Sequence, residues 1–299
     1  MSPVSDLRRR AFITGLIAAP GLARADAPLS VTASFTILAD MVRQIAGALA
    51  SVRSLVPVAG DAHIFEPRPS DVQAVADARL LIENGLGFEG WMTRLQQAAN
   101  YSGPVVVAST GIKPRKMTED GAVVLDPHAW QDPHNGEIYA TNIIEGLAAA
   151  DPTHAATFRA EGQTYIDAIR ETDAWVTHTL ADIPSARRKI ITTHDAFGYF
   201  GDRYGIEFRA AEGISTDAEP SAKAIAALVT QIRQEKIRAV FIENMTSPRI
   251  ATMLARETGA VLGGTVYSDA LSAPGGPADT YLRMFRHNVT LFVAAMRAN

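Results

Sequence analysis

The chain has 299 residues, of which 47% are hydrophobic and 20% charged, and its formal net charge is −4. This size predicts one large or two medium globular domains, and the acidic balance argues against a nucleic acid or an anionic membrane as the main partner. Because the chain contains no cysteine, thiol nucleophiles, disulfides and thiolate metal sites are excluded. Any metal would be held by nitrogen and oxygen atoms.

Residues 1–25 have the pattern of an export signal. Three arginines at 8–10 precede the apolar run 11–22, which is too short to anchor the chain in a membrane, and residues 23–25 read A-R-A, a small-residue cleavage site. The order R-R-A-F-I within this segment resembles a twin-arginine signal, with an ordinary secretory signal as the alternative. We expect a periplasmic mature protein that begins at Asp26 and has no stable membrane insertion.

From residue 26 to 150, strand-like runs alternate with helical patterns, which predicts a mostly parallel sheet covered by helices. The strand-like runs are 29–37, 52–58, 79–86 and 104–110, and the helical patterns are 38–49, 70–78 and 89–100. For the helix at 70–78, Ser70 or Asp71 is the expected N-cap.

Helix-forming sequence then extends from Asn135 to Ala181, interrupted only at Asp151-Pro152. Proline fits the first turn of a new helix, so we expect one long helix within 151–183 that joins two lobes.

The alternation resumes in residues 184–299. Strand-like runs are 188–194, 208–214, 239–245 and 260–267, and helical patterns are 219–236, 247–259 and 280–297. The sequence therefore predicts an α/β fold of two lobes, 26–150 and 184–299, each with a mostly parallel sheet.

The seven histidines divide into two groups. His63, His128 and His194 each follow a strand or an apolar run where a loop begins, and the His63 loop DAHIFEPRPSD is stiffened by prolines. Because ligands of open α/β sheets bind beyond the carboxyl ends of the strands, we expect these three to converge on one site. The alternative for each is a histidine that hydrogen-bonds its own loop. The other four are interpreted as surface or capping residues: His134, His154, His178 and His287.

Asp269, in TVYSDALS, also follows a β-like run, although aspartate is common in turns. Together with the three histidines it would form a nitrogen and oxygen site suited to Zn²⁺, with Mn²⁺ or Fe²⁺ as alternatives. Asp195 and Glu66 are candidates for groups that orient the ligands, or are simple loop caps.

Four segments, in order along the chain, resemble the metal-binding proteins of zinc and manganese ABC importers, the cluster A-I solute-binding family. They are GDAHIFEPRPSD, DPHAWQDP, THDAFGYF and YSDALS. The resemblance implies two α/β lobes joined by a rigid helix, with a metal in the cleft held by His63, His128, His194 and Asp269. It also implies a periplasmic protein, expected to be a monomer, that delivers the metal to the transmembrane permease of an ABC importer.

Two departures from the family bear on the metal. Segment 111–127 has no histidine, so the histidine-rich loop of many zinc-importing members is missing. Manganese-selective members carry glutamate at the third ligand position, whereas His194 favours zinc. Manganese or iron stays the alternative, and export of a folded protein would allow metal loading in the cytoplasm.

Other classes of function fit less well. A mononuclear zinc hydrolase needs an open coordination position, which Asp269 would fill, and the chain has no H-E-x-x-H motif. We therefore expect no enzymatic activity. A third interpretation is an adhesion protein built on the same scaffold.

Overall fold

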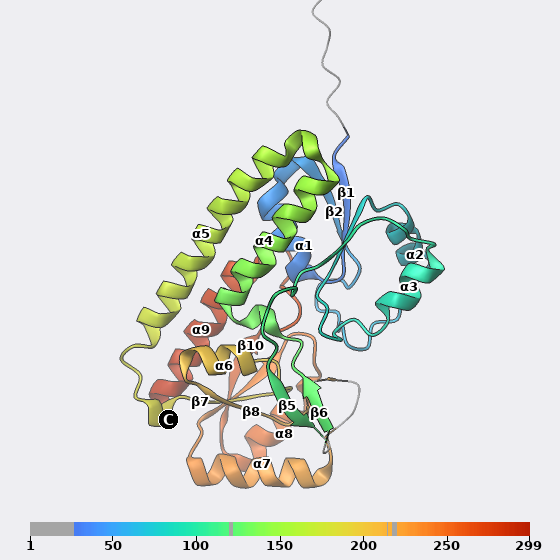
Figure 1. The fold of residues 1–299 in the computed structure, drawn as a ribbon. Helices are drawn as coiled ribbons and strands as arrows, with labels where there is room; N and C mark the ends of the chain where they lie inside the picture. The colour runs from blue at the N-terminus through green and yellow to red at the C-terminus, as the bar shows by residue number, and fades with distance from the viewer. Residues whose placement is uncertain (1–26, 120–121, 214, 217–219) are drawn as a thin grey trace, which may run out of the picture.

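The computed structural model describes residues 27–119, 122–213, 215–216 and 220–299, and it contains two parallel four-stranded sheets in separate lobes (Figure 1). The expected export signal, 1–25, lies outside the described residues. The first sheet has the order β2-β1-β3-β4 and the second β10-β9-β7-β8, with parallel neighbours throughout. When strands are numbered within each lobe, both orders become 2-1-3-4, so the lobes share one topology.

The first lobe follows the predicted alternation. Its elements are β1 (Leu29–Ala33), α1 (Thr36–Ala46), β2 (Ala50–Ser54), α2 (Pro69–Ala76), β3 (Leu80–Glu83), α3 (Met92–Ala98) and β4 (Val105–Val107), with a 3-10 turn at Gly47–Leu49. The start of α2 differs from the prediction. Asp71 is inside the first turn, where its Oδ2 accepts a hydrogen bond from the N–H of Arg68 at 2.9 Å, as in the second half of a capping box.

An antiparallel hairpin, β5 (Lys116–Glu119) and β6 (Ala122–Leu125), follows the first sheet and was not predicted. Both strands are short, and β6, in which Val123 is 71% exposed, lacks the buried apolar face that makes a strand recognisable in sequence. A 3-10 turn (Ala129–Gln131) then leads into α4 (Pro133–Ala150).

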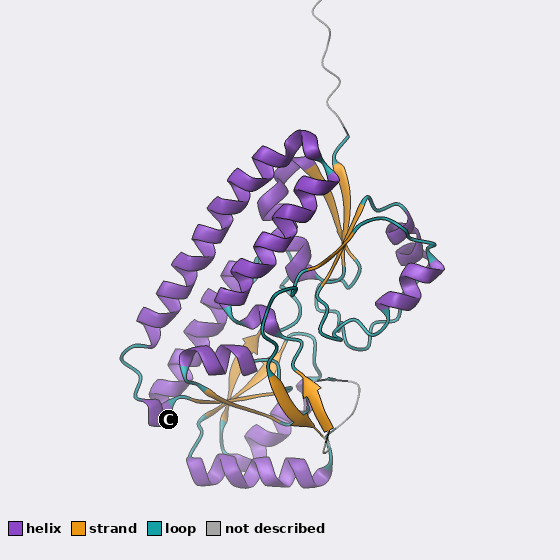
Figure 2. Cartoon of the chain, in the orientation of Figure 1, coloured by secondary structure: helices purple, strands orange, loops and turns teal. Residues whose placement is uncertain are grey.

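The predicted joining helix is confirmed. A 3-10 turn (Pro152–His154) continues into α5 (Ala155–Leu180), which runs from the first lobe to the second beside α4 (Figures 1 and 2). Its 26 residues span about 39 Å at 1.5 Å per residue. Gly162 allows the close approach to α4, because a Cβ there would lie 2.3 Å from Cδ1 of Ile144.

The second lobe repeats the alternation. Its elements are a 3-10 turn (Ser185–Arg187), β7 (Lys189–Thr192), α6 (Gly198–Tyr204), β8 (Glu207–Ala210), α7 (Ala222–Glu235), β9 (Ala239–Glu243), α8 (Pro248–Thr258), β10 (Val261–Val266) and α9 (Tyr281–Ala298). Only α6 was not predicted as a helix, since it has seven residues, two of them glycines. In the described ranges no helix has the length and apolar character needed to cross a membrane.

The cores of the two lobes are not independent. One apolar cluster extends from the first sheet to α9 and one face of the second sheet, where the ring of Phe292 meets four other phenylalanine rings at centroid distances of 5.3–6.0 Å. A smaller cluster, which includes Ile191, Val240 and Leu254, lies under α7 and α8 on the other face of that sheet. The second sheet is therefore packed between the shared core and a core of its own.

Phe292→Ala should lower the free energy of unfolding by about 3–5 kcal/mol, because it opens a cavity where α9 meets the second sheet. Phe292 is 1% exposed. Denaturant unfolding followed by circular dichroism would measure the loss. Val123→Ala, at a site that is 71% exposed, is the control and should change stability by less than about 0.5 kcal/mol. Equal effects of the two substitutions would contradict this description of the core.

Candidate metal centre

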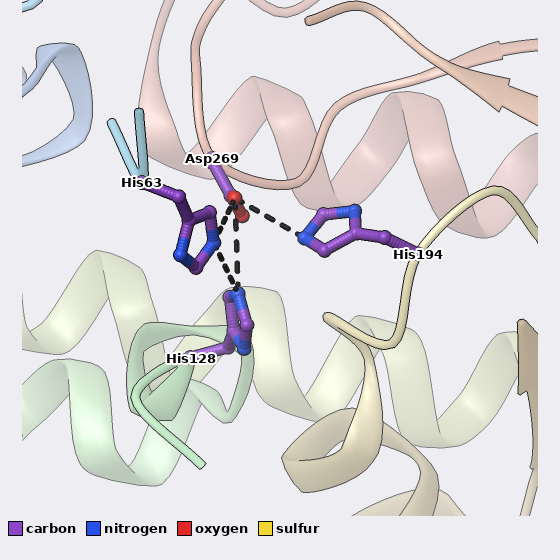
Figure 3. Close-up of side chains that lie close together, drawn as sticks. All are labelled: His63, His128, His194 and Asp269. Carbon is purple, nitrogen blue, oxygen red and sulfur yellow. Dashed lines mark hydrogen bonds and ion pairs between the residues drawn. The ribbon is translucent and has the colours of Figure 1, made fainter. Parts of the chain in front are cut away.

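Four side chains from distant parts of the sequence converge between the lobes: His63, His128, His194 and Asp269 (Figure 3). One nitrogen or oxygen from each lies within 4.8 Å of the others. Across the part of the chain that the structure describes, no other cluster of this kind occurs. The convergence that the sequence predicted is therefore present in the fold.

His63 is held by the stiff loop that follows β2. Its backbone N–H donates to Oδ1 of Asp61 at 2.9 Å, and the indole N–H of Trp91 donates to the carbonyl of Ala62 at 2.8 Å. The imidazole packs edge-on against Phe88, with the ring centroids 4.8 Å apart. Backbone and ring are thus both fixed, and Nε2 faces the centre of the site.

His128 is fully buried and follows the hairpin instead of a strand of either parallel sheet. Asp126 orients it: Oδ1 lies 2.8 Å from Nδ1 of the ring and accepts the His128 backbone N–H at 3.0 Å. The other oxygen of Asp126 is 3.2 Å from Nη1 of Arg115. With Nδ1 engaged in this way, Nε2 is left for the site.

His194 follows β7 directly and is also fully buried. Glu243, the last residue of β9, accepts the His194 backbone N–H through Oε1 at 2.8 Å. Its Oε2 lies 2.5 Å from Nδ1 of the ring. A carboxylate at this position keeps the proton on Nδ1 and directs Nε2 toward the centre.

Asp269 follows β10, and its Oδ2 lies among the three rings (Figure 3). The distances from Oδ2 to the Nε2 atoms are 3.2 Å for His63, 3.2 Å for His194 and 3.7 Å for His128. The carboxylate is fully buried, and neither oxygen has a hydrogen bond of normal geometry within the described residues. Burial of an anion without donors is unfavourable unless a positive charge compensates it, so the arrangement fits a cation.

Protonation of the rings depends on this carboxylate. Burial lowers the pKa of His63. Burial opposes charge on His128 as well, but the charges and hydrogen bonds of Asp269 and Asp126 together outweigh it and raise the His128 pKa to about 9. Glu243 and Asp269 likewise raise the pKa of His194, and the imidazolium charges hold the pKa of Asp269 well below its usual value despite burial. An entering cation must displace protons from two rings.

The spacing of the four donors suits tetrahedral zinc. Ligands at about 2.0–2.1 Å from a tetrahedral ion lie about 3.3–3.4 Å from one another. The separation between Nε2 of His63 and Nε2 of His128 is 3.3 Å, and Oδ2 of Asp269 lies 3.2 Å from the Nε2 atoms of His63 and His194 and 3.7 Å from that of His128. If all four donors bound one ion, no position would be open for an attacking water, and the arrangement would favour binding over hydrolysis.

The remaining histidines lie outside the cluster, as expected. The side chain of His134 is 62% exposed, and Nδ1 of His154 lies 2.7 Å from Oδ2 of Asp151 on the surface of the long helix. His178 is exposed, and Nε2 of His287 lies 2.8 Å from the carbonyl oxygen of Thr265.

The ligand-orienting residues are not the two that the sequence suggested. Asp126 and Glu243 hold the rings, whereas Glu66 is exposed and the backbone N–H of Asp195 bonds to the carbonyl of Gly213. Two signals in the sequence point to the actual residues. Asp126 comes two positions before His128, and Glu243 closes an apolar strand at the sheet edge that carries the site.

Comparisons with known proteins find relatives over most of the chain. Residues 31–295 match the family model described as ZnuA, zinc-uptake complex component A, periplasmic. The manganese-binding lipoprotein MntA of Halalkalibacterium halodurans is 33% identical over 268 residues, which cover 90% of this chain and 88% of that protein. The iron-binding protein YfeA of Yersinia pestis is 32% identical over 260 residues, or 87% and 83% of the two chains.

Among solved structures, the periplasmic zinc binding protein TroA from Treponema pallidum superimposes with a TM-score of 0.85 at 30% identity. The match covers 90% of this chain and 99% of that one. The two-lobed fold is therefore shared with a solved protein over nearly its whole length.

Glu243→Gln should weaken zinc binding about 10–100-fold. An amide nitrogen facing Nδ1 of His194 favours the tautomer with the proton on Nε2, where the metal has to bind. Competition with a chromophoric chelator at pH 7 would measure the dissociation constant. The matched control is Glu66→Gln at an exposed position, which should bind like the wild type. An unchanged constant for Glu243→Gln would show that this contact does not orient the ring.

Zinc affinity should fall as the pH falls from 8 to 5. The pKa of His128 is raised to about 9 and that of His194 is raised well above its usual value, so both rings hold protons over this range, and each proton that zinc must displace costs about tenfold in affinity per pH unit. The dissociation constant measured at each pH in buffers that do not bind zinc would test this. Affinity that stays flat over the range would argue against imidazole ligands.

Proposed function

We propose that this chain, which belongs to the ZnuA family of periplasmic zinc-uptake components, captures a divalent transition metal and delivers it to the permease of an ABC importer. As a member of this family it is a metal-binding substrate-binding protein of an ABC transporter and not an enzyme. The observation that carries the proposal is the buried Asp269 carboxylate, whose Oδ2 faces three imidazole nitrogens and no hydrogen-bond donor of normal geometry among the described residues.

We infer that the four ligands are His63, His128, His194 and Asp269, and that zinc is the preferred ion. Three imidazoles and one carboxylate form a donor set typical of zinc, and manganese binds most weakly of the first-row divalent ions at such a site. The near-tetrahedral donor spacing supports the same ion. The relatives differ in metal, since their names state manganese, iron or zinc.

Manganese is the second candidate, favoured by the names of several relatives. A cell that exports the folded protein through a twin-arginine route would load it in the cytoplasm, where metal availability differs from that in the periplasm. The metal found in the isolated protein would then differ from the metal bound most tightly in vitro.

We propose a periplasmic location and a monomeric state. The export pattern at 1–25 and the family description support the location. The monomer is supported by the site itself, because one chain supplies all four donors and both orienting carboxylates. A second copy would add nothing to the coordination.

The metal-free wild type should take up one equivalent of zinc and bind it far more tightly than manganese, while His194→Ala should lose tenfold or more in zinc affinity. Zinc at 100 times its dissociation constant should also stabilise the wild type by about 2.7 kcal/mol. Titration with each metal, together with elemental analysis of protein isolated from the periplasm, would measure these effects.

His154→Ala is the control for this titration, because His154 is bonded to Asp151 at the end of the long helix and lies outside the cluster. Its zinc affinity should equal that of the wild type. A large loss in this variant would mean that the ligand set is wrong. Isolated protein that contains no metal and binds neither zinc nor manganese on titration would contradict the proposed function.

A further inference from the structure

We infer that Asp269, although it follows a strand of the second sheet, is positioned by the first lobe, so that His194 is the one ligand carried by the second sheet. Metal release would then separate His194 from the other three ligands instead of dividing the site evenly between the lobes. This inference rests on the proposed function, since it concerns how the metal site comes apart.

The residue next to Asp269 is held by the turn that follows His128. The carbonyl oxygen of Ser268 accepts two hydrogen bonds, from the indole N–H of Trp130 at 2.9 Å and from Nε2 of Gln131 at 2.8 Å. Both donors are almost fully buried, with exposures of 0% and 1%. Buried hydrogen bonds of this kind are costly to break without replacement, so the Asp269 backbone is fixed relative to His128.

The rest of the loop after Asp269 is bonded to α1 of the first lobe. The backbone N–H of Leu271 donates to Oγ1 of Thr36 at 2.9 Å, and the N–H of Tyr281 donates to Oδ2 of Asp40 at 2.7 Å. Each contact joins positions more than 230 residues apart in the chain. The loop therefore crosses from the second lobe and is attached to the first at both ends.

Trp130 also connects this loop to the His63 side of the site. Its ring packs against Phe35 and Phe88, each at a centroid distance of 4.9 Å, and Phe88 packs against His63 at 4.8 Å. One aromatic cluster thus connects the residues that surround three of the ligands. His63, His128 and Asp269 belong to a single packed body.

His194 is held differently. Its backbone N–H bonds to Glu243 on β9, and the hydroxyl of Thr193 donates to the same carboxylate at 2.8 Å. Its carbonyl oxygen accepts from Thr192 and Ala196, so its described hydrogen bonds stay within the second lobe. The outer face of this sheet packs with α7 and α8 through its own apolar cluster, so these elements would move with His194 as one unit, while the inner face would slide on the shared core.

Pairs of spin labels would test which ligands move together. Because the chain has no cysteine, Thr93→Cys on α3, Ala273→Cys in the Asp269 loop and Thr252→Cys on α8 give unique exposed labelling sites. When zinc is removed, the 93–252 distance should change by about 2 Å or more, while the 93–273 distance stays constant. A joint change of both distances, or no change in either, would overturn the inference.

Binding of zinc to the unlabelled protein is measured separately. A protein that takes up no zinc fails the proposed function, and the inference falls with it. A protein that binds zinc but shows the wrong distance pattern fails the inference alone.

Two matched threonine variants test the positioning role. Thr36→Val removes the acceptor of the Leu271 N–H and should weaken zinc binding about tenfold and broaden the 93–273 distance distribution. Thr32→Val removes an equally buried hydrogen bond, to the Ala74 carbonyl at 3.0 Å, far from the Asp269 loop. It should destabilise the fold without changing affinity or that distribution. Equal behaviour of the two variants would overturn the positioning role.

Discussion

The arrangement of side chains in the site depends on one buried negative charge, the carboxylate of Asp269. A carboxylate without hydrogen-bond donors is expensive to bury, and here it is buried completely. Protons on His128 and His194 compensate it until a cation replaces them. The loops that bring the rings to this point are therefore organised around an exchange of protons for metal.

The charge balance around the rings favours a divalent ion. Three buried carboxylates contact the imidazoles: Asp269 in the centre, Asp126 behind His128 and Glu243 behind His194. Arg115 lies beside Asp126 and supplies one positive charge. A divalent cation at the centre, with neutral rings, would supply the other two. A monovalent ion would leave a buried negative charge uncompensated, which the low dielectric of the interior makes costly.

The sequence predicted those parts of the fold and site that have a periodic or repeated signal. Alternating apolar runs located both parallel sheets, and the uninterrupted helical pattern located α5. His63, His194 and Asp269 were found because parallel strands bring their carboxyl ends together, whereas His128 follows the antiparallel hairpin. The hairpin and α6 were missed because they are too short for their periodicity to be read. Glu243 was missed because its role depends on which strands are neighbours in space, and Asp126 because its contact with the His128 ring, two positions on, forms only in the folded loop.

The two lobes have the same strand order, yet their parts in the site are unequal. Tight capture requires rings that are already oriented, and the first lobe provides this through buried hydrogen bonds and aromatic packing around His63, His128 and Asp269. Delivery requires that some contact can be lost without unfolding the protein. A ligand on a sheet with its own outer core would meet this need, because the sheet would move with α7 and α8 as one unit while its inner face slides on the shared core. We infer that high affinity and release depend on different elements of the same fold.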